Sequence, residues 1–304
     1  MNLNITNETA RLRAVVLGQP GSMGPVPLPG NTYDAKSYDS VIKGIYPTEE
    51  AVYKEMIAFE KVLLKYNVQV FRPWILENCN QVFARDAAFV IDDKIINSNI
   101  IPDREDEKEA YEVIYDQIAY NKIYNLPEKA HVEGGDVVLY NDLIFVGIYT
   151  GDNYSQLKSA RTNSYAFYFL KELFPSKTFI PIELIKNDTD PYQSVLHLDC
   201  AFMPVGKDKV IVYKKGFRFE KDYNLVKEIF GEKNIFELSQ EEMYSMNSNI
   251  FSISPEVVVS EQNFHRLNEH IENEWNIQVE RIPYAEISKM GGLLRCSTLP
   301  LIRE

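Results

Sequence analysis

The apolar residues of the chain recur in short paired runs that flank polar turns. Four stretches show this pattern, over residues 87–96, 137–146, 201–213 and 250–259. Two apolar runs joined by a short turn of Asp, Asn, Gly, Ser or Pro predict a β-hairpin. A stretch with helical spacing of apolar residues follows each hairpin, over 105–119, 155–173, 220–230 and 261–275. A further strand then closes the unit, as over 177–182 and 277–282.

The N-terminal part of the chain fits a variant of the same unit. It has a strand over 13–18, a long loop, a helix over 48–66 and a strand over 68–71. Five comparable units predict radial repetition about an axis, with the chain ends meeting to close a ring. An open α/β sheet is the alternative, but paired strands before every helix disfavour a simple βαβ alternation. We expect one domain over 1–304, because no Pro/Gly/Ser-rich linker divides it.

Composition and charge narrow the class of partner. The chain of 304 residues is 45% hydrophobic and has a net charge of −12, which argues against nucleic acid and anionic membranes and suits a cationic small molecule. There is no secretory signal pattern and no apolar run of membrane-spanning length. Three cysteines form no disulfide framework, so a reducing, cytoplasmic location is expected. A homo-oligomer is compatible with this composition.

The candidate chemistry starts from Cys296, which follows Gly291 and Gly292 near the C-terminus. Three polar motifs lie upstream, at residues 83–86 (FARD), 133–136 (EGGD) and 197–199 (HLD). Each motif ends in an Asp just before the first strand of a unit, so a ring would bring them all to one central pocket. A cysteine, a histidine and several carboxylates predict covalent catalysis on a cationic substrate.

Each of these motifs also has a plainer interpretation. Cys296 alone would more often be a buried core residue, His197 a hydrogen-bonded core histidine, and EGGD a turn with solvated acids. In an extended HLD segment, His197 and Asp199 would share one face, and Cys200 would alternate to the other. A metal site from His197, Asp199 and a cysteine is conceivable, but no close-spaced ligand pair supports it. We therefore expect no metal and no cofactor.

Taken together, the motifs FARD, EGGDV, HLDCAF, MNSNIFSISPEVVV and GGLLRCSTLPLIR resemble the guanidine-modifying (pentein) superfamily. That group includes arginine deiminase, dimethylargininase and the amidinotransferases, and the similarity runs from about Arg13 to Arg303. The resemblance implies a five-bladed α/β-propeller of ββαβ-type units and a covalent thiouronium intermediate. It further implies that Cys296 is the nucleophile and His197 the general acid/base. The carboxylates that bind the guanidinium would be Asp86, Glu133 and Asp199.

Three more residues bear on the substrate. Asn80, Arg104 and Arg161 resemble the groups with which arginine deiminases hold the carboxylate and amine of arginine. The alternative for the two arginines is surface charge, with Arg104 capping an acidic helix start. The expected function is hydrolysis of the guanidino group of arginine or a close analogue, giving citrulline or ornithine, and ammonia. An amidinotransferase, a dimethylarginine hydrolase and a non-catalytic guanidine-binding protein are the alternatives.

Overall fold

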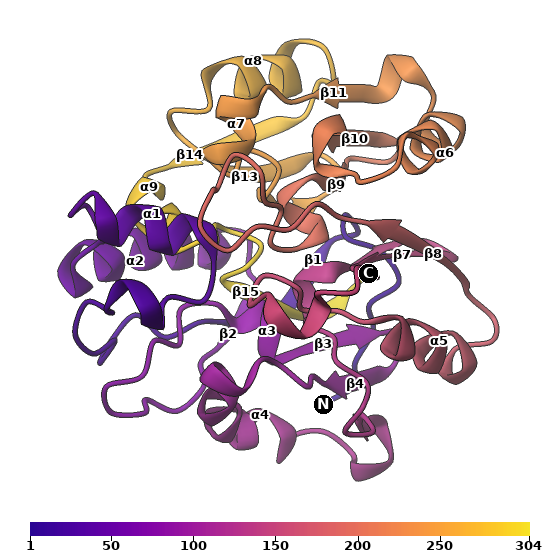
Figure 1. Cartoon of the computed structure of the whole chain (residues 1–304). Coiled ribbons are helices and arrows are strands. Elements are labelled where there is room, and N and C mark those ends of the chain that lie inside the picture. Colours follow the sequence, from indigo (N-terminus) through magenta and orange to yellow (C-terminus); the bar gives the residue numbers. More distant parts are fainter.

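The computed structural model describes residues 1–304 and contains five three-stranded sheets arranged around a centre (Figure 1). In every sheet the middle strand is antiparallel to one neighbour. It is parallel to the other. The strands are β1 (Leu12–Leu17), β2 (Gln69–Phe71), β3 (Ala88–Ile91), β4 (Lys94–Asn97), β5 (Ile123–Asn125), β6 (Val137–Tyr140), β7 (Leu143–Ile148), β8 (Thr178–Glu183), β9 (Phe202–Val205), β10 (Lys209–Val212), β11 (Ile235–Glu237), β12 (Phe251–Ser254), β13 (Val257–Glu261), β14 (Gln278–Ile282) and β15 (Thr298–Arg303).

The chain ends close the ring. The last strand, β15, pairs antiparallel with β1, with Leu17 opposite Thr298 and Leu12 opposite Arg303. The C-terminus therefore supplies the first strand of the sheet that the N-terminal segment completes with β1 and β2. The predicted five-bladed α/β-propeller of ββαβ units is confirmed.

Helices connect the second and third strands of the blades. They are α1 (Ala35–Ile42), α2 (Glu49–Lys65), α4 (Glu112–Tyr115), α5 (Ser164–Leu173), α6 (Glu220–Phe230) and α8 (His265–Asn273), with short helices α3 (Ala84–Ala87), α7 (Gln240–Tyr244) and α9 (Ala285–Ser288) elsewhere. The helix predicted over 220–230 matches α6, and that over 48–66 matches α2. None of the helices combines the length and apolar character that a membrane span requires.

Two helix predictions were only partly right. The stretch 105–119 is mainly a 3-10 helix, Pro102–Tyr111, which turns Arg104, Glu107 and Ala110 inward. A 3-10 helix has three residues per turn, so side chains three apart lie on one face, whereas the predicted α-helix has 3.6 residues per turn. The helix expected over 155–173 begins only at Ser164, because the Asn163 side chain caps it by accepting from the backbone N–H of Ala166.

The blades place their entry turns next to one another. The turn before β3, which contains α3, packs against the 3-10 turn Gly134–Asp136 before β6. The Gly134–Asp136 turn also packs against Leu198–Cys200, the 3-10 turn before β9. Residues at this position of each blade therefore meet near the axis of the propeller.

Candidate active site

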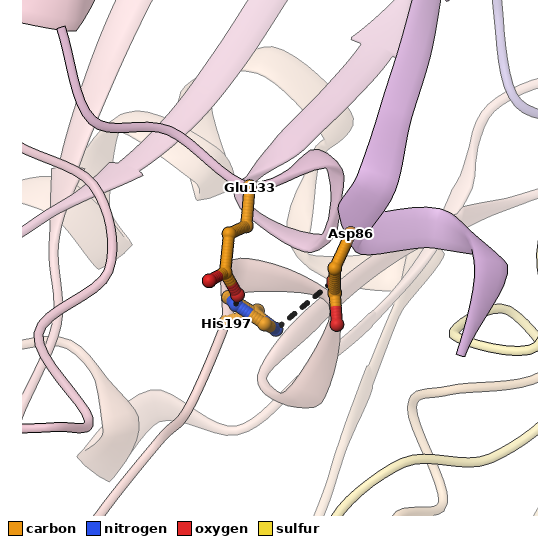
Figure 2. A group of neighbouring side chains, drawn as sticks. All are labelled: Asp86, Glu133 and His197. Atoms are coloured by element: carbon orange, nitrogen blue, oxygen red, sulfur yellow. Dashed lines mark hydrogen bonds and ion pairs between the residues drawn. The ribbon is translucent and has the colours of Figure 1, made fainter. Parts of the chain in front are cut away.

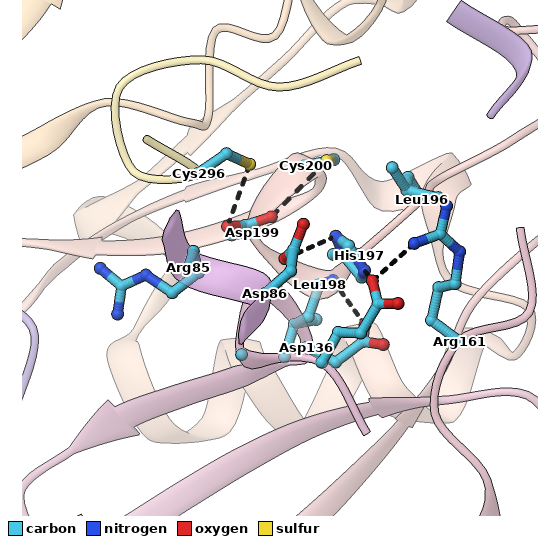
Figure 3. Close-up of polar contacts among 12 residues, drawn as sticks. Arg85, Asp86, Asp136, Arg161, Leu196, His197, Leu198, Asp199, Cys200 and Cys296 are labelled. Atoms are coloured by element: carbon cyan, nitrogen blue, oxygen red, sulfur yellow. Dashed lines mark hydrogen bonds and ion pairs between the residues drawn. The ribbon is translucent and has the colours of Figure 1, made fainter. Parts of the chain in front are cut away.

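Each blade contributes a polar side chain from the segment just before its first strand. All five side chains are buried, with at most 3% of each residue exposed. Figure 3 shows four of the contributing segments converging from elements far apart in the chain. The five residues, in chain order, are Asp86, Glu133, His197, Asn249 and Cys296. Four of them were predicted from the sequence, while Asn249 was not singled out.

Cys296 lies between an amide and a carboxylate. The Asn249 side-chain N–H₂ donates to Sγ at 3.2 Å, and the Cys296 backbone N–H donates to Asn249 Oδ1 at 3.1 Å. The thiol is 3.7 Å from Asp199 Oδ2. Burial, with Asp199 and other neighbours adding to it, raises the pKa of Cys296 well above its ordinary value. The thiol is thus protonated at neutral pH without ligand, and a bound cation would offset the nearby carboxylates and favour the thiolate.

His197 is held between two carboxylates (Figure 2). Its Nε2 is 2.8 Å from Glu133 Oε2, and its Nδ1 is 3.7 Å from Asp86 Oδ1. Burial opposes the charged imidazolium, but Asp86 and Glu133 outweigh it and raise the pKa of His197. Neither Nδ1 nor Asp86 Oδ1 has a hydrogen-bond partner, so both can meet a ligand. The ring packs on Gly135, where an added Cβ would lie 2.6 Å from Nδ1, which explains the glycine of the EGGD motif.

The HLD segment is not extended, so that prediction was wrong. Leu198–Cys200 forms a 3-10 turn, because the Leu198 N–H donates to Asp136 Oδ1 at 2.9 Å and the Cys200 N–H to the His197 carbonyl. His197 and Asp199 consequently point to different partners, Glu133 and Cys296. Cys200 is not on the opposite face either, since its Sγ lies 3.6 Å from Asp199 Oδ1.

Two arginine side chains form salt bridges with carboxylates of the site. Arg104 donates to Asp86 at 2.7 Å and forms a two-pronged pair with Glu107 at 2.7 and 2.8 Å. Arg161 donates to Glu133 at 2.6 Å. The Arg104 and Arg161 side chains are only 7% and 1% exposed. The surface-charge alternative for these arginines is therefore wrong.

The site encloses a cavity that separates the predicted residues into two groups. Asn80, Asp86, Arg104, Arg161, His197 and Cys296 line it. Glu133 and Asp199 do not line it. Glu133 contacts His197 and Arg161, and Asp199 pairs with Arg295 at 2.8 Å. Direct contact of these two carboxylates with a substrate stays a prediction.

Two residues around Cys296 were not predicted from the sequence. Arg295 joins Asp199 to Glu8, whose carboxylate is 2.8 Å from its guanidinium, and so fixes the segment that precedes Cys296. Asn249 stands in the fifth unit where Asp86 and His197 stand in theirs. Its place before a hairpin was the available signal, but it has no charge to draw attention.

Asp86, Glu133 and His197 could also surround a metal ion, since one ligand atom from each lies within 4.8 Å of the others. Arg104 and Arg161 already donate to the two carboxylates. Their positive charges would repel a divalent cation placed among the same oxygens. The arrangement suits an organic cation that brings its own N–H donors.

Comparison with known proteins adds to this geometry. Residues 37–303 match the family model of eukaryotic N,N dimethylarginine dimethylhydrolase. The chain is 27% identical to the Bacillus subtilis protein YkgA over 247 residues, which are 80% of this chain and 77% of that protein. It is 29% identical to arginine deiminase of Clostridium perfringens over 214 residues, 60% of this chain, and spans about half (49%) of that relative's length.

Among solved structures, the product-bound N-terminal domain of ArgZ, an arginine dihydrolase from the ornithine–ammonia cycle in cyanobacteria, superposes with a TM-score of 0.78. The two share 15% identity over 95% of this chain and 97% of that one. At this identity the likeness shows the fold.

Proposed function

Since the chain belongs to the N,N-dimethylarginine dimethylhydrolase family, we propose that it is a hydrolase that cleaves a C–N bond in the guanidino group of arginine. One observation carries the proposal: Cys296, His197 and Asp86 line the same cavity. A guanidinium is a poor electrophile, because its charge is spread over three nitrogens, so a strong nucleophile and fixed carboxylates are needed. The match to arginine deiminases favours arginine over its methylated forms.

In the proposed first step, the substrate cation offsets Asp86 and Asp199, and Cys296 loses its proton to solvent. The thiolate then attacks the guanidino carbon, and a C–S bond forms. Protonated His197 gives its proton to one terminal nitrogen, the C–N bond breaks, and ammonia leaves. The product on the enzyme is a cationic thiouronium on Cys296.

Neutral His197 completes the reaction. It takes a proton from water while the oxygen attacks the thiouronium carbon. The C–S bond then breaks, the thiolate leaves, and the hydroxyl proton is released, so that the substrate becomes the urea of citrulline. Glu133, 2.8 Å from Nε2, positions the imidazole and stabilises its charged form. A second round on citrulline would release its terminal nitrogen as ammonia and its ureido carbon as carbon dioxide, and so give ornithine.

We assign the substrate carboxylate to Asn80, Arg104 and Arg161. A guanidinium has five N–H donors. Arg104 and Arg161 each make three hydrogen bonds to the protein, which leaves donors on both for a ligand. Both arginines and Asn80 line the cavity. Both cations line the same cavity as Cys296, which suits a substrate with an anionic and a guanidinium end.

The test is a substrate screen with product identification. Wild type and Cys296→Ser are incubated with arginine, asymmetric dimethylarginine, agmatine and citrulline, and ammonia, dimethylamine, citrulline and ornithine are quantified. We expect ammonia and citrulline from arginine, and nothing from the variant. If dimethylarginine is the one compound turned over, with release of dimethylamine, the proposed C–N hydrolysis stands but the substrate is dimethylarginine. No turnover of any guanidino compound would overturn the proposal.

Amidinotransfer to an amine is the second candidate function, because an acidic cavity lies next to the one that contains Cys296. A wider cavity adjoins the inner one through Tyr33, Asn80 and Arg104. Five carboxylates line it and could attract a cationic amine acceptor: Glu77, Asp103, Asp106, Glu107 and Glu109. Arginine with and without glycine, ornithine or lysine separates the reactions. Amidinated acceptor without ammonia would replace the hydrolase assignment.

The setting of the enzyme is also proposed. Cys79, Cys200 and Cys296 are all free thiols, as a reducing cytoplasm would keep them. We take residues 1–304 to work as one domain.

A further inference from the structure

Three carboxylates line the inner cavity, and one of them lacks a cationic partner. Asp86 and Glu107 both pair with Arg104. Asp34 forms no salt bridge, although only 6% of the residue is exposed. The nearest lysine in sequence, Lys36, turns its ammonium to the Tyr244 carbonyl, 2.8 Å away. Burial raises the pKa of Asp34, and the positive charge of Arg161 nearby offsets this only in part.

The Asp34 carboxylate is fixed in place. It caps α1, with Oδ1 accepting from the backbone N–H groups of Lys36 and Ser37 at 2.9 and 2.8 Å, and Oδ2 accepting from the Ser37 hydroxyl at 2.6 Å. On its other side it packs on Gly291, whose φ is +85° and where an added Cβ would lie 2.4 Å from Oδ1. The carboxylate thus contacts the segment that leads to Cys296.

Arg161 lies beside this carboxylate. Its Nη2 donates to the carbonyl of Tyr33, the residue before Asp34, at 2.7 Å. A buried cation and a buried anion are therefore neighbours on the cavity wall. An α-amino acid carries the complementary pair, a carboxylate and an ammonium on the same carbon.

We propose that Asp34 receives the α-ammonium of the substrate and is a specificity-determining residue, an inference that rests on the function proposed above. A carboxylate accepts about four hydrogen bonds. Three are used, and Oδ2 has room for an ammonium N–H. The site would then read both charges of an α-amino acid, with Arg161 on the carboxylate and Asp34 on the ammonium.

The plain alternative is that Asp34 only caps α1. Asn caps helices about as well as Asp, so Asp34→Asn keeps the cap and removes the charge. Two arginine analogues, each lacking one of the charged groups on the α-carbon, test the ammonium and the carboxylate separately. The first, 5-guanidinopentanoate, keeps the guanidinium and carboxylate but has no ammonium. Agmatine keeps the guanidinium and ammonium but has no carboxylate.

Binding is measured by titration calorimetry in a Cys296→Ser background, so the answer does not depend on turnover. Asp34→Asn should weaken arginine and agmatine by about ten- to a hundredfold, as for a lost charge-assisted hydrogen bond in a dry site. Binding of 5-guanidinopentanoate should not weaken, and the melting temperature should hold. Equal weakening of arginine and 5-guanidinopentanoate, unchanged arginine binding, or no arginine binding at all would each overturn the assignment.

The proposed function is judged separately, by turnover in the Cys296 wild type. If the wild type turns over arginine and Asp34→Asn leaves arginine binding unchanged, the hydrolase assignment stands and the ammonium-binding role of Asp34 is rejected. Binding that depends on Asp34 without turnover would keep the ammonium site and reject the hydrolase.

Discussion

Replacement of Asn249 should make the Cys296 thiol less acidic. The Asn249 amide donates to Cys296 Sγ at 3.2 Å, and this bond strengthens when the sulfur becomes an anion. A hydrogen bond to a charged group contributes about 1.5–3 kcal/mol. Since about 1.4 kcal/mol corresponds to one pKa unit, Asn249→Ala should raise the pKa of Cys296 by about one to two units. The thiolate fraction at a fixed pH below that pKa should fall about ten- to a hundredfold.

Asn249→Asp provides the matched comparison. It keeps the oxygen that accepts from the Cys296 backbone N–H at 3.1 Å, and replaces only the donor by a second carboxylate oxygen. A like charge at this distance should suppress the thiolate further than Asn249→Ala does. Cys200→Ser controls for modification at the neighbouring thiol, whose Sγ is near Asp199 rather than Asn249.

The assay is the rate of iodoacetamide alkylation of Cys296 as a function of pH, followed by intact-mass spectrometry. Rates should fall in the order wild type, Asn249→Ala, Asn249→Asp, with the pH midpoint moving upward. Variants within about twofold of wild type, or Asn249→Asp faster than Asn249→Ala, would show that the amide does not stabilise the thiolate.

Three further predictions concern catalysis, substrate choice and stability. Cys296→Ser should lower kcat by at least about a thousandfold with an unchanged melting curve, while Cys200→Ser keeps most activity; a Cys296→Ser rate within about tenfold of wild type would reject the nucleophile. Arg161→Lys, which keeps the charge but loses the fork, should raise KM for arginine about tenfold or more and narrow its advantage over agmatine, and equal use of both by wild type would refute the carboxylate clamp. Burial alone would raise the pKa of Glu8, but Arg295 and Arg85 lower it to about 2. The ionised Glu8 therefore contributes fully to the free energy of unfolding above the ordinary pKa of 4.5, and this contribution is lost as the pH falls through 2. Urea unfolding across that pH range should show about 3 kcal/mol of acid-sensitive stability that Glu8→Gln lacks, and parallel losses in both proteins would contradict this.

Much of the architecture could be read from local patterns. Hairpins with polar turns recur because each blade must bury two adjacent strands and expose one tight turn. Helix α6 (Glu220–Phe230) coincides with its predicted range because its apolar residues follow a 3.6-residue period. The same reasoning failed over much of 105–119, because the 3-10 helix Pro102–Tyr111 buries Arg104, Glu107 and Ala110, which are three residues apart. Their inward side is partly charged, so no apolar stripe marks it.

The sequence by itself determined the number of blades, the ring closure and the chemical set of cysteine, histidine and carboxylates, because these depend on local periodicity and residue type. Only the tertiary structure decided which groups face each other. It put Arg104 on Asp86, Arg161 on Glu133, and Asn249 on Cys296. These partners are 18 to 47 residues apart and come from different elements. Buried charges must be paired, but the choice among several partners is made by distances across the ring that no local pattern carries.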